Sequence, residues 1–159
     1  MQLSINRESL LKAINLIAKA ADKRHNMVIL GNIKLQLSEG ALILTASDLE
    51  VELTSTLKLP AGACIEAGTT TLPATKLRDI CKSLPSQAQV NLTTQENERC
   101  LLTSGKSRFT LGTLPSEDYP SLGNPENITP LTISRSRLTD LIHKTQFAMA
   151  IQDVRYYLT

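Results

Sequence analysis

The fold of this chain is decided by its opening stretch, MQLSINRESLLKAINLIAKAA, residues 1–21. Apolar and polar residues alternate through Leu3-Ser4-Ile5, which predicts a short strand. Asn6 follows as a favourable helix cap, because its side-chain oxygen can accept a backbone N–H of the first turn. Apolar residues then recur at helical spacing and predict an amphipathic helix over 7–21: Leu10, Ile14, Ile17, Ala18 and Ala21.

The same pattern returns 128 residues later, where Leu131-Thr132-Ile133-Ser134-Arg135 restates Leu3-Ser4-Ile5-Asn6-Arg7. This constant offset gives seven identities in the 29 positions from 3 to 31. Any strand, cap and helix share part of this pattern, but one register across a helix and the next strand favours an internal duplication. A unit of about 30 residues cannot bury the apolar face of its helix. We therefore expect either a fragment or a last segment that packs on something else.

The chain between the two copies is mainly strand-like. Residues 41–48 and 49–59 are expected to form neighbouring antiparallel strands, and alternation predicts further strands at 33–38, 90–92, 100–102 and 109–111, with a Thr-rich strand near 69–72. A second amphipathic helix is predicted over 74–84, between Pro73 and Pro85. Residues 115–130 contain four prolines and no periodicity, which predicts an interdomain linker.

Composition disfavours several classes of protein. Hydrophobic residues make up 42% of the 159 residues, enough for a packed core. Aromatic residues make up only 3%, with no Trp, which disfavours proteins that bind single-stranded nucleic acid by stacking. The three cysteines form no CxxC pair, the first residues lack a signal peptide's apolar run, and no apolar run reaches the roughly 20 residues of a membrane span. We expect a soluble, reduced, cytoplasmic protein.

The formal net charge of +2 conceals a separation between the helices and the rest of the chain. The helical stretches 7–24, 74–84 and 135–147 hold eleven basic and four acidic residues, a net charge of +7, and the remainder carries −5. Helices favour Lys and Arg on solvated faces, but they favour Glu as well, and only one Glu is present. Helices on one side of a sheet would then form a positive surface suited to phosphate without base recognition.

No catalytic motif is present in the sequence. His25 and His143 lack partners at metal-ligand spacing, and there is neither a phosphate-binding glycine loop nor a GxSxG nucleophile motif. By period-2 spacing, Asp48, Glu50 and Glu52 would share one strand face and could present carboxylates to a metal, although a solvent-facing strand edge is the more ordinary interpretation. We predict no catalytic residue, no metal and no cofactor.

Several segments, in their order and spacing, match one known family over nearly the whole chain. They include Ile29-Leu30-Gly31-Asn32-Ile33, Leu44-Thr45-Ala46-Ser47-Asp48-Leu49-Glu50, Leu72-Pro73-Ala74-Thr75-Lys76, Ser104-Gly105-Lys106-Ser107-Arg108-Phe109 and Gln152-Asp153-Val154-Arg155-Tyr156-Tyr157-Leu158. On these segments the chain resembles the bacterial sliding clamp, the beta subunit of DNA polymerase III.

The resemblance implies an α+β DNA-clamp fold, in which two helices pack on the inner side of antiparallel sheets and the domain is repeated. Residues 1–125 would form clamp domain 1, and residues 126–159 would form the incomplete start of clamp domain 2. The family's chain is more than twice as long and has three such domains, and two chains close head to tail into a homodimer ring. The implied function is a processivity factor for DNA replication, with no catalysis of its own.

The resemblance also implies which residues touch DNA: Arg24, Gln152, Tyr156 and Tyr157. Arg24 and Gln152 are themselves 128 residues apart, so the repeat would place them in equivalent loops. An Arg can give phosphate charge-assisted hydrogen bonds, whereas a Gln holds it loosely. Such contacts would orient double-stranded DNA without base-specific contacts that stop sliding.

Two further surfaces are implied by the resemblance. The pocket that receives the peptides of partner proteins would include Arg155, Tyr157 and Leu158. The ring interface would use an outer strand, with apolar packing by two side chains and cations that meet the partner's acids: Lys76, Lys106, Arg108, Phe109 and Leu111. An ordinary edge strand, protected from aggregation by Lys and Arg, is the alternative.

The partners implied are the polymerase III catalytic subunit, the clamp loader and other replication and repair proteins that bind clamps, with no membrane. Three departures from the family's pattern put single contacts in doubt: Thr75, Ile151 and Met27-Val28. Two other functions stay open on the residues alone. One is a metal-dependent nucleic-acid-modifying enzyme subunit, and the other is a plain protein-interaction domain.

Overall fold

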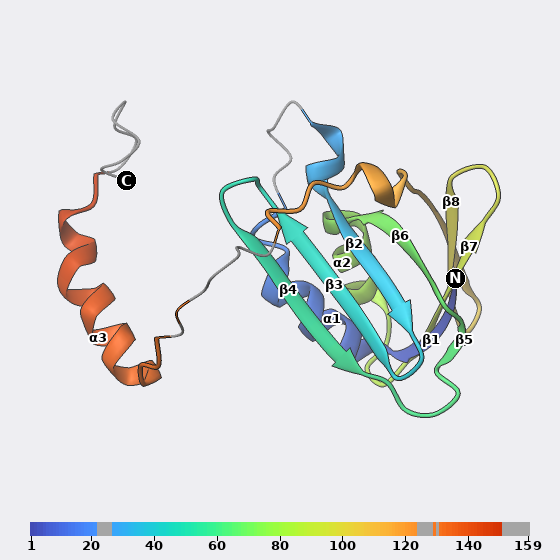
Figure 1. The fold of residues 1–159 in the computed structure, drawn as a ribbon. Helices are drawn as coiled ribbons and strands as arrows, with labels where there is room; N and C mark the ends of the chain where they lie inside the picture. Colours follow the sequence, from blue (N-terminus) through green and yellow to red (C-terminus); the bar gives the residue numbers. More distant parts are fainter. Residues whose placement is uncertain (22–26, 124–128, 130, 151–159) are drawn as a thin grey trace. The chain divides into compact units, whose positions relative to one another are not determined.

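A computed structural model describes residues 1–21, 27–123, 129 and 131–150. The chain divides into two compact units, Met1–Gly123 and Asn124–Thr159, which are described separately. Figure 1 shows the first unit as sheets and helices and the second as one main helix.

The opening stretch forms a strand and a helix as the sequence predicts. Strand β1 (Gln2–Asn6) leads directly into α1 (Arg7–Ile17), where the Asn6 side chain accepts the backbone N–H of Glu8 at 2.8 Å. The helix buries four apolar residues spaced by three or four: Leu10, Ala13, Ile14 and Ile17. It ends at Ile17, four residues before the predicted end, since residues 18–20 form a turn.

A four-stranded antiparallel sheet has the order β4-β3-β2-β6. Its strands are β2 (Asn32–Ser38), β3 (Ala41–Ser47), β4 (Glu52–Lys58) and β6 (Gly68–Pro73). A short 3-10 helix, η1 (Val28–Gly31), precedes β2. The strands predicted at 33–38, 41–48 and 69–72 are confirmed, while the strand predicted from residue 49 begins only at Glu52.

A five-stranded antiparallel sheet has the order β5-β1-β7-β8-β9. Besides β1 it contains β5 (Cys64–Glu66), β7 (Gln89–Gln95), β8 (Arg99–Ser104) and β9 (Ser107–Gly112). The first strand of the chain therefore lies inside the sheet, between β5 and β7, while β9 forms an open edge. The sequence did not predict β5, because three residues are too few for a visible alternation.

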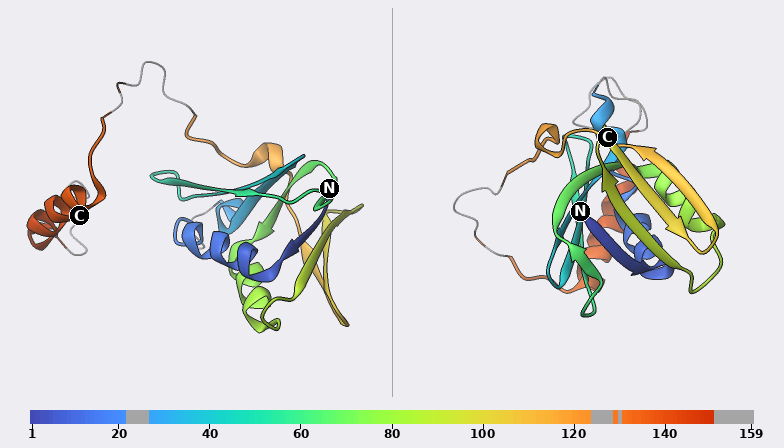
Figure 2. Two further views of the ribbon diagram at one scale, coloured as in Figure 1. Left: turned by 90° about the horizontal axis from the view of Figure 1, so that it is seen from below. Right: turned by 90° about the vertical axis from the view of Figure 1, so that its right-hand side faces the viewer.

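Helices α1 and α2 (Ala74–Ser83) lie side by side against these sheets and share one apolar core with them. Figure 2 shows both helices on the same side of the four-stranded sheet, with the five-stranded sheet beside them. The core includes Leu3 of β1, Leu44 of β3 and Leu77 of α2, each fully buried. The predicted α+β fold, with two helices packed on antiparallel sheets, is confirmed.

The proline-rich segment after β9 is not a free linker at its start. It forms a 3-10 turn, η2 (Ser116–Asp118), and then buries Tyr119 to 5% exposure. The Tyr119 hydroxyl accepts the backbone N–H of Ser47 at 3.1 Å and donates to the carbonyl of Asn32 at 3.2 Å. Residues 113–119 are therefore tied to the four-stranded sheet.

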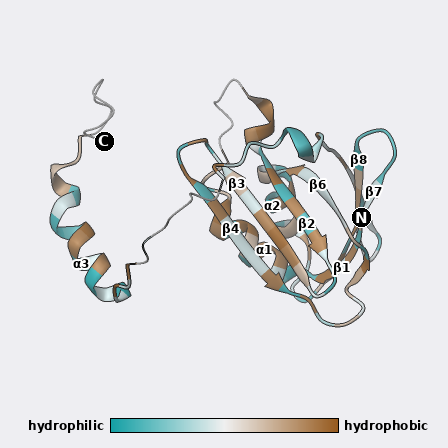
Figure 3. Cartoon of the chain, viewed as in Figure 1, coloured by the Kyte–Doolittle hydropathy of each residue, from teal (hydrophilic) through white to brown (hydrophobic). Residues whose placement is uncertain are grey.

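The second unit contains α3 (Arg135–Thr145) and a 3-10 turn, η3 (Gln146–Ala148). The bounds of α3 are those of α1 shifted by 128, and Ser134 caps α3 as Asn6 caps α1. The repeat predicts a copy of the first strand at the start of this unit. Residues 131–134, which the structure describes, adopt no strand, so that copy is absent there. Figure 3 shows hydrophobic and hydrophilic residues mixed along α3.

Candidate nucleic-acid interface

Four lysines lie exposed on the two helices of the first unit or directly after them. Lys12 lies on α1 and Lys19 just beyond it, whereas Lys76 and Lys82 lie on α2. We call these four residues the basic helix layer. Lys12 lies opposite the buried stripe of α1, and Lys19, in the turn after the helix, is exposed as well.

Two arginines counted in the helical charge have structural partners. Arg7 donates from Nε to the carbonyl of Cys81 at 2.6 Å and from Nη2 to the carbonyl of Lys82 at 3.2 Å. It thus satisfies carbonyls at the C-terminus of α2, where a cation also interacts favourably with the helix dipole. Arg78 contacts the neighbouring Asp79 at 3.3 Å, an exposed pair that contributes little to stability.

The residues expected to contact DNA lie outside the described part of the chain: Arg24, Gln152, Tyr156 and Tyr157. Arg155 and Leu158 of the expected peptide pocket lie outside it too, as does Ile151. Of the other departures from the family's pattern, Thr75 is half-buried on α2, and Met27 and Val28 are exposed before β2.

The three carboxylates considered as metal ligands do not share a strand face, so that expectation is wrong. Asp48 lies in the turn between β3 and β4, where its Oδ1 accepts the backbone N–H of Val51 at 2.7 Å and that of Glu50 at 3.0 Å. These bonds, chiefly the one from Val51, lower the pKa of the Asp48 carboxyl. Among the described residues, no group of three His, Cys, Asp or Glu is arranged to hold a metal ion.

Strand β9 presents an open backbone edge. In the pairing of β8 with β9, the N–H of Thr113 donates to Glu98, so every second pair from there toward the turn is hydrogen-bonded. The backbone groups of Arg108, Thr110 and Gly112 fall between those pairs. They therefore point away from β8, toward the free edge.

The side chains expected at the ring interface fall into three groups. Lys106 is exposed in the turn between β8 and β9, Arg108 is exposed on β9, and Lys76 is exposed on α2. Phe109 is half-buried against the core. Leu111 is only 5% exposed and belongs to the core, so its side chain is not available to a partner. Of the two side chains expected to make the apolar contact of the ring interface, only Phe109 is left.

The sequence did not reveal two features of the structure, the open backbone edge of β9 and the burial of Tyr119. The alternation of exposed and buried residues along β9 was visible, but the open edge depends on the order of strands in the sheet. Tyr119 stood among prolines with no periodic neighbours, so only its aromatic character signalled burial.

The fold and this interface define a clamp-type α+β domain with a basic helix layer and an open strand edge. Residues 1–123 match the family model described as DNA polymerase III beta subunit, N-terminal domain. The chain belongs to that family. It is 43% identical over 158 residues to a beta sliding clamp from Pseudomonas putida and 42% identical over 158 residues to one from Escherichia coli K12.

Solved structures agree with these relatives. A sliding clamp from Pseudomonas aeruginosa, crystallised with griselimycin, matches with a TM-score of 0.90 at 43% identity, covering 99% of this chain and 42% of that one. The polymerase III beta subunit of Caulobacter crescentus matches with a TM-score of 0.91 at 32% identity, with the same coverage. The chain spans 42% of the length of the Pseudomonas putida relative. No helix among the described residues is long and apolar enough to span a bilayer.

Proposed function

We propose that this chain contributes clamp domain 1, residues 1–125, and the start of clamp domain 2, residues 126–159, to a sliding clamp. Such a clamp is a non-catalytic processivity factor that encircles duplex DNA and tethers the replicative polymerase. The observation that carries this proposal is the 43% identity to a beta sliding clamp over 99% of the chain. The basic helix layer supports it on independent physical grounds.

DNA would be attracted by the basic helix layer through its phosphates. Lysines on long flexible side chains neutralise phosphate and release counterions, without reading the base sequence. We propose Arg24, Gln152, Tyr156 and Tyr157 as additional DNA contacts. This combination of weak, sequence-independent contacts would hold DNA within the clamp while it slides.

The homodimer ring would close at the edge of β9. The outward backbone groups of Arg108, Thr110 and Gly112 can pair with a strand of a second chain, which extends the five-stranded sheet. Lys106 and Arg108 would meet acidic side chains there, Phe109 would add the apolar contact, and Lys76 would lie nearby. Leu111 would make no contact with the second chain and would only anchor β9 to the core.

The partners would be the polymerase III catalytic subunit, the clamp loader and other replication and repair proteins that bind clamps, in the cytoplasm. Arg155, Tyr157 and Leu158 would form part of the pocket for their peptides. The names of the relatives support a role with DNA polymerase III in general.

The DNA proposal is tested by measuring the affinity of the 159-residue chain for duplex DNA as a function of salt. Replacing Lys12 and Lys19 together by Gln should weaken binding uniformly across sequences. It should also reduce the slope of log affinity against log salt by about one per lost phosphate contact. Lys58→Gln on β4 is the matched control, since Lys58 is exposed but lies off the helices. A loss per lysine at Lys58 equal to that at Lys12 and Lys19 would show that the basic helix layer is not the DNA-binding surface, and no loss at any of the three would favour a plain protein-interaction domain instead.

The ring proposal needs a complete clamp. A chimera in which these 159 residues replace the matching segment of the Pseudomonas putida relative should stay on nicked circular DNA and slide off once the circle is cut. Retention that is the same on circular and linear DNA would contradict encirclement. Replacing Thr110 by Pro, which blocks an edge N–H and disfavours strand pairing, should abolish the dimer of the chimera.

A further inference from the structure

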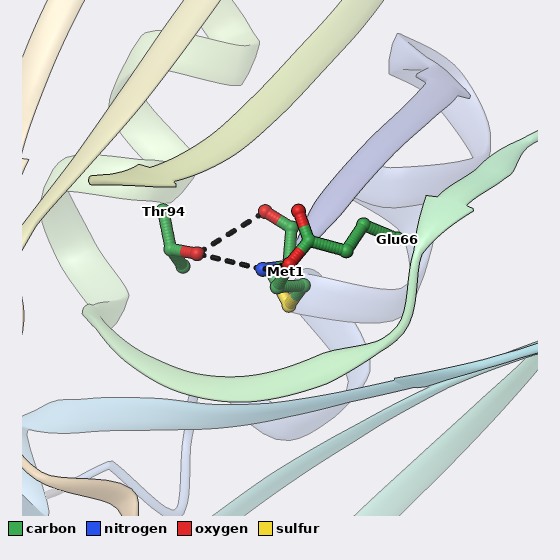
Figure 4. Close-up of polar contacts among 3 residues, drawn as sticks. All are labelled: Met1, Glu66 and Thr94. Atoms are coloured by element: carbon green, nitrogen blue, oxygen red, sulfur yellow. Dashed lines mark hydrogen bonds and ion pairs between the residues drawn. The ribbon is translucent and has the colours of Figure 1, made fainter. Parts of the chain in front are cut away.

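The amino group of Met1 is held inside the fold rather than left in solvent. Met1 precedes β1, the strand enclosed between β5 and β7, and the residue is only 7% exposed. Figure 4 shows its nitrogen between the side chains of Thr94, from β7, and Glu66, from β5. A charged group in this place must be matched by polar partners, because burying an unpaired charge is costly.

Thr94 makes three hydrogen bonds to Met1. The α-ammonium nitrogen donates to Thr94 Oγ1 at 2.8 Å, and the Met1 carbonyl accepts from the Thr94 backbone N–H at 3.0 Å and from its hydroxyl at 3.2 Å. The backbone bond continues the pairing of Gln2 with Thr93 by one residue. The hydroxyl therefore both accepts from and donates to the same residue, which fixes the position of the amino group.

Glu66 provides the opposite charge. Its Oε1 lies 3.6 Å from the Met1 nitrogen, and its side chain is 70% exposed, so solvent weakens this ion pair. Thr94 is therefore the stronger partner, and Glu66 compensates the charge from the side open to water.

Gly68 leaves little space beside Met1. A Cβ on Gly68 would lie 3.1 Å from the Met1 Cβ and 3.5 Å from the Met1 nitrogen. Additional atoms on the nitrogen would have to fit beside this close backbone approach or displace the partners on the other side.

We propose that the free α-ammonium group of Met1 is a structural cation bound by Thr94 and Glu66, so that acylation of this amine destabilises the first unit. An acyl group, such as the formyl group carried by bacterial initiator methionine, turns the ammonium into a neutral amide with one N–H. A single N–H cannot serve both Thr94 and Glu66, and the charge that Glu66 compensates is gone. This amino group is a modification-sensitive site, independent of any contact with DNA.

The test compares two preparations of the 159-residue chain, one with a free Met1 amine and one N-formylated by expression with peptide deformylase inhibited. Mass spectrometry verifies each form, and urea unfolding is followed by far-ultraviolet circular dichroism. The formylated form should have an unfolding equilibrium constant about tenfold higher, because a charge-assisted hydrogen bond is lost. Indistinguishable unfolding curves would overturn the proposal.

Variants of Thr94 separate this effect from a general disturbance of the strand. In Thr94→Val the hydroxyl is absent, so formylation should cost clearly less than in the parent chain, whereas Thr94→Ser should retain most of the parent's penalty. This comparison is a double-mutant cycle between the amine and the hydroxyl. A formylation penalty of the same size in the parent and in Thr94→Val would show that the hydroxyl does not bind the amine.

Discussion

Replacing Tyr119 by Phe should destabilise the first unit through one buried hydroxyl. In the parent structure this hydroxyl lies between the ends of β2 and β3, where it accepts the N–H of Ser47 and donates to the carbonyl of Asn32. The pairing of β2 with β3 would place Asn32 opposite Ser47, so the hydroxyl replaces a direct bond between the two strands. Phe keeps the ring and its apolar contacts but removes both hydrogen bonds.

The magnitude follows from the burial of the two groups left behind. Ser47 is 1% exposed and Asn32 is 6% exposed, so water cannot readily take the place of the hydroxyl. A buried donor left without an acceptor costs about 1–3 kcal/mol, and we expect about 2 kcal/mol less free energy of unfolding. With the urea dependence usual for small domains, this corresponds to a midpoint lower by about 1 M.

Urea unfolding followed by circular dichroism measures this change, and amide hydrogen exchange at Ser47 should accelerate in the variant. Thr54→Val is the control, because it removes a hydroxyl at an exposed position on β4, where the contact with Thr45 is long at 3.4 Å. That variant should stay within about 0.5 kcal/mol of the parent. If Tyr119→Phe were as stable as the parent, with unchanged protection at Ser47, the strands would have closed on each other and the reasoning would be refuted.

Arg7→Gln should lower the free energy of unfolding by about 1–2 kcal/mol, because the two bonds to carbonyls at the end of α2 are lost; urea unfolding measures it, and an unchanged midpoint would deny the capping role. Burial raises the pKa of the Cys81 and Cys100 thiols from 9.0 to about 11, so the folded state disfavours their ionisation. The contribution of the two buried thiols to the free energy of unfolding should be fully present below pH 9 and should be lost as the pH rises toward 11. Cys100→Ala should flatten this decline in a pH series of unfolding midpoints. A decline that this variant leaves unaltered would mean that other groups cause it. Gly68→Ala should lower the thermal midpoint, since Gly68 has φ +157° and an added Cβ would crowd Met1; a midpoint equal to the parent's would mean that the strand shifts freely.

Local patterns in the sequence predicted most of the elements in the first unit. Alternation identified β2 and β3, and Asn6 marked the start of α1 because its chemistry as a cap is a property of one residue. Side chains that bridge distant segments could not be predicted in this way. Tyr119 reaches strands more than 70 residues earlier, and Arg7 reaches the end of a helix 74 residues later.

The predicted ring interface likewise combines features that the sequence could indicate with features that depend on the whole fold. Lys106 and Arg108 were predicted at the interface from the family resemblance, and both are exposed in the structure, Arg108 on β9 and Lys106 in the turn before it. The alternation of Phe109 and Leu111 with polar residues was visible, but the nearly complete burial of Leu111 depends on how the sheet packs on the shared core. The prediction that three carboxylates share a strand face was wrong for a related reason. Asp48 accepts hydrogen bonds from the backbone N–H groups of Glu50 and Val51, and the turn that results interrupts the alternation of a strand.

The enclosed position of β1 bears on how the chain folds as it is synthesised. Leu3 pairs with Leu92, so β1 leaves the ribosome well before β7 and has to wait for that strand before its sheet can form. The four-stranded sheet has no such delay, because β2, β3, β4 and β6 follow one another within residues 32–73. Non-local pairings form slowly, since the loop between them must close first. Folding should therefore begin in the middle of the first unit, and the earliest residues of the chain should be among the last to dock.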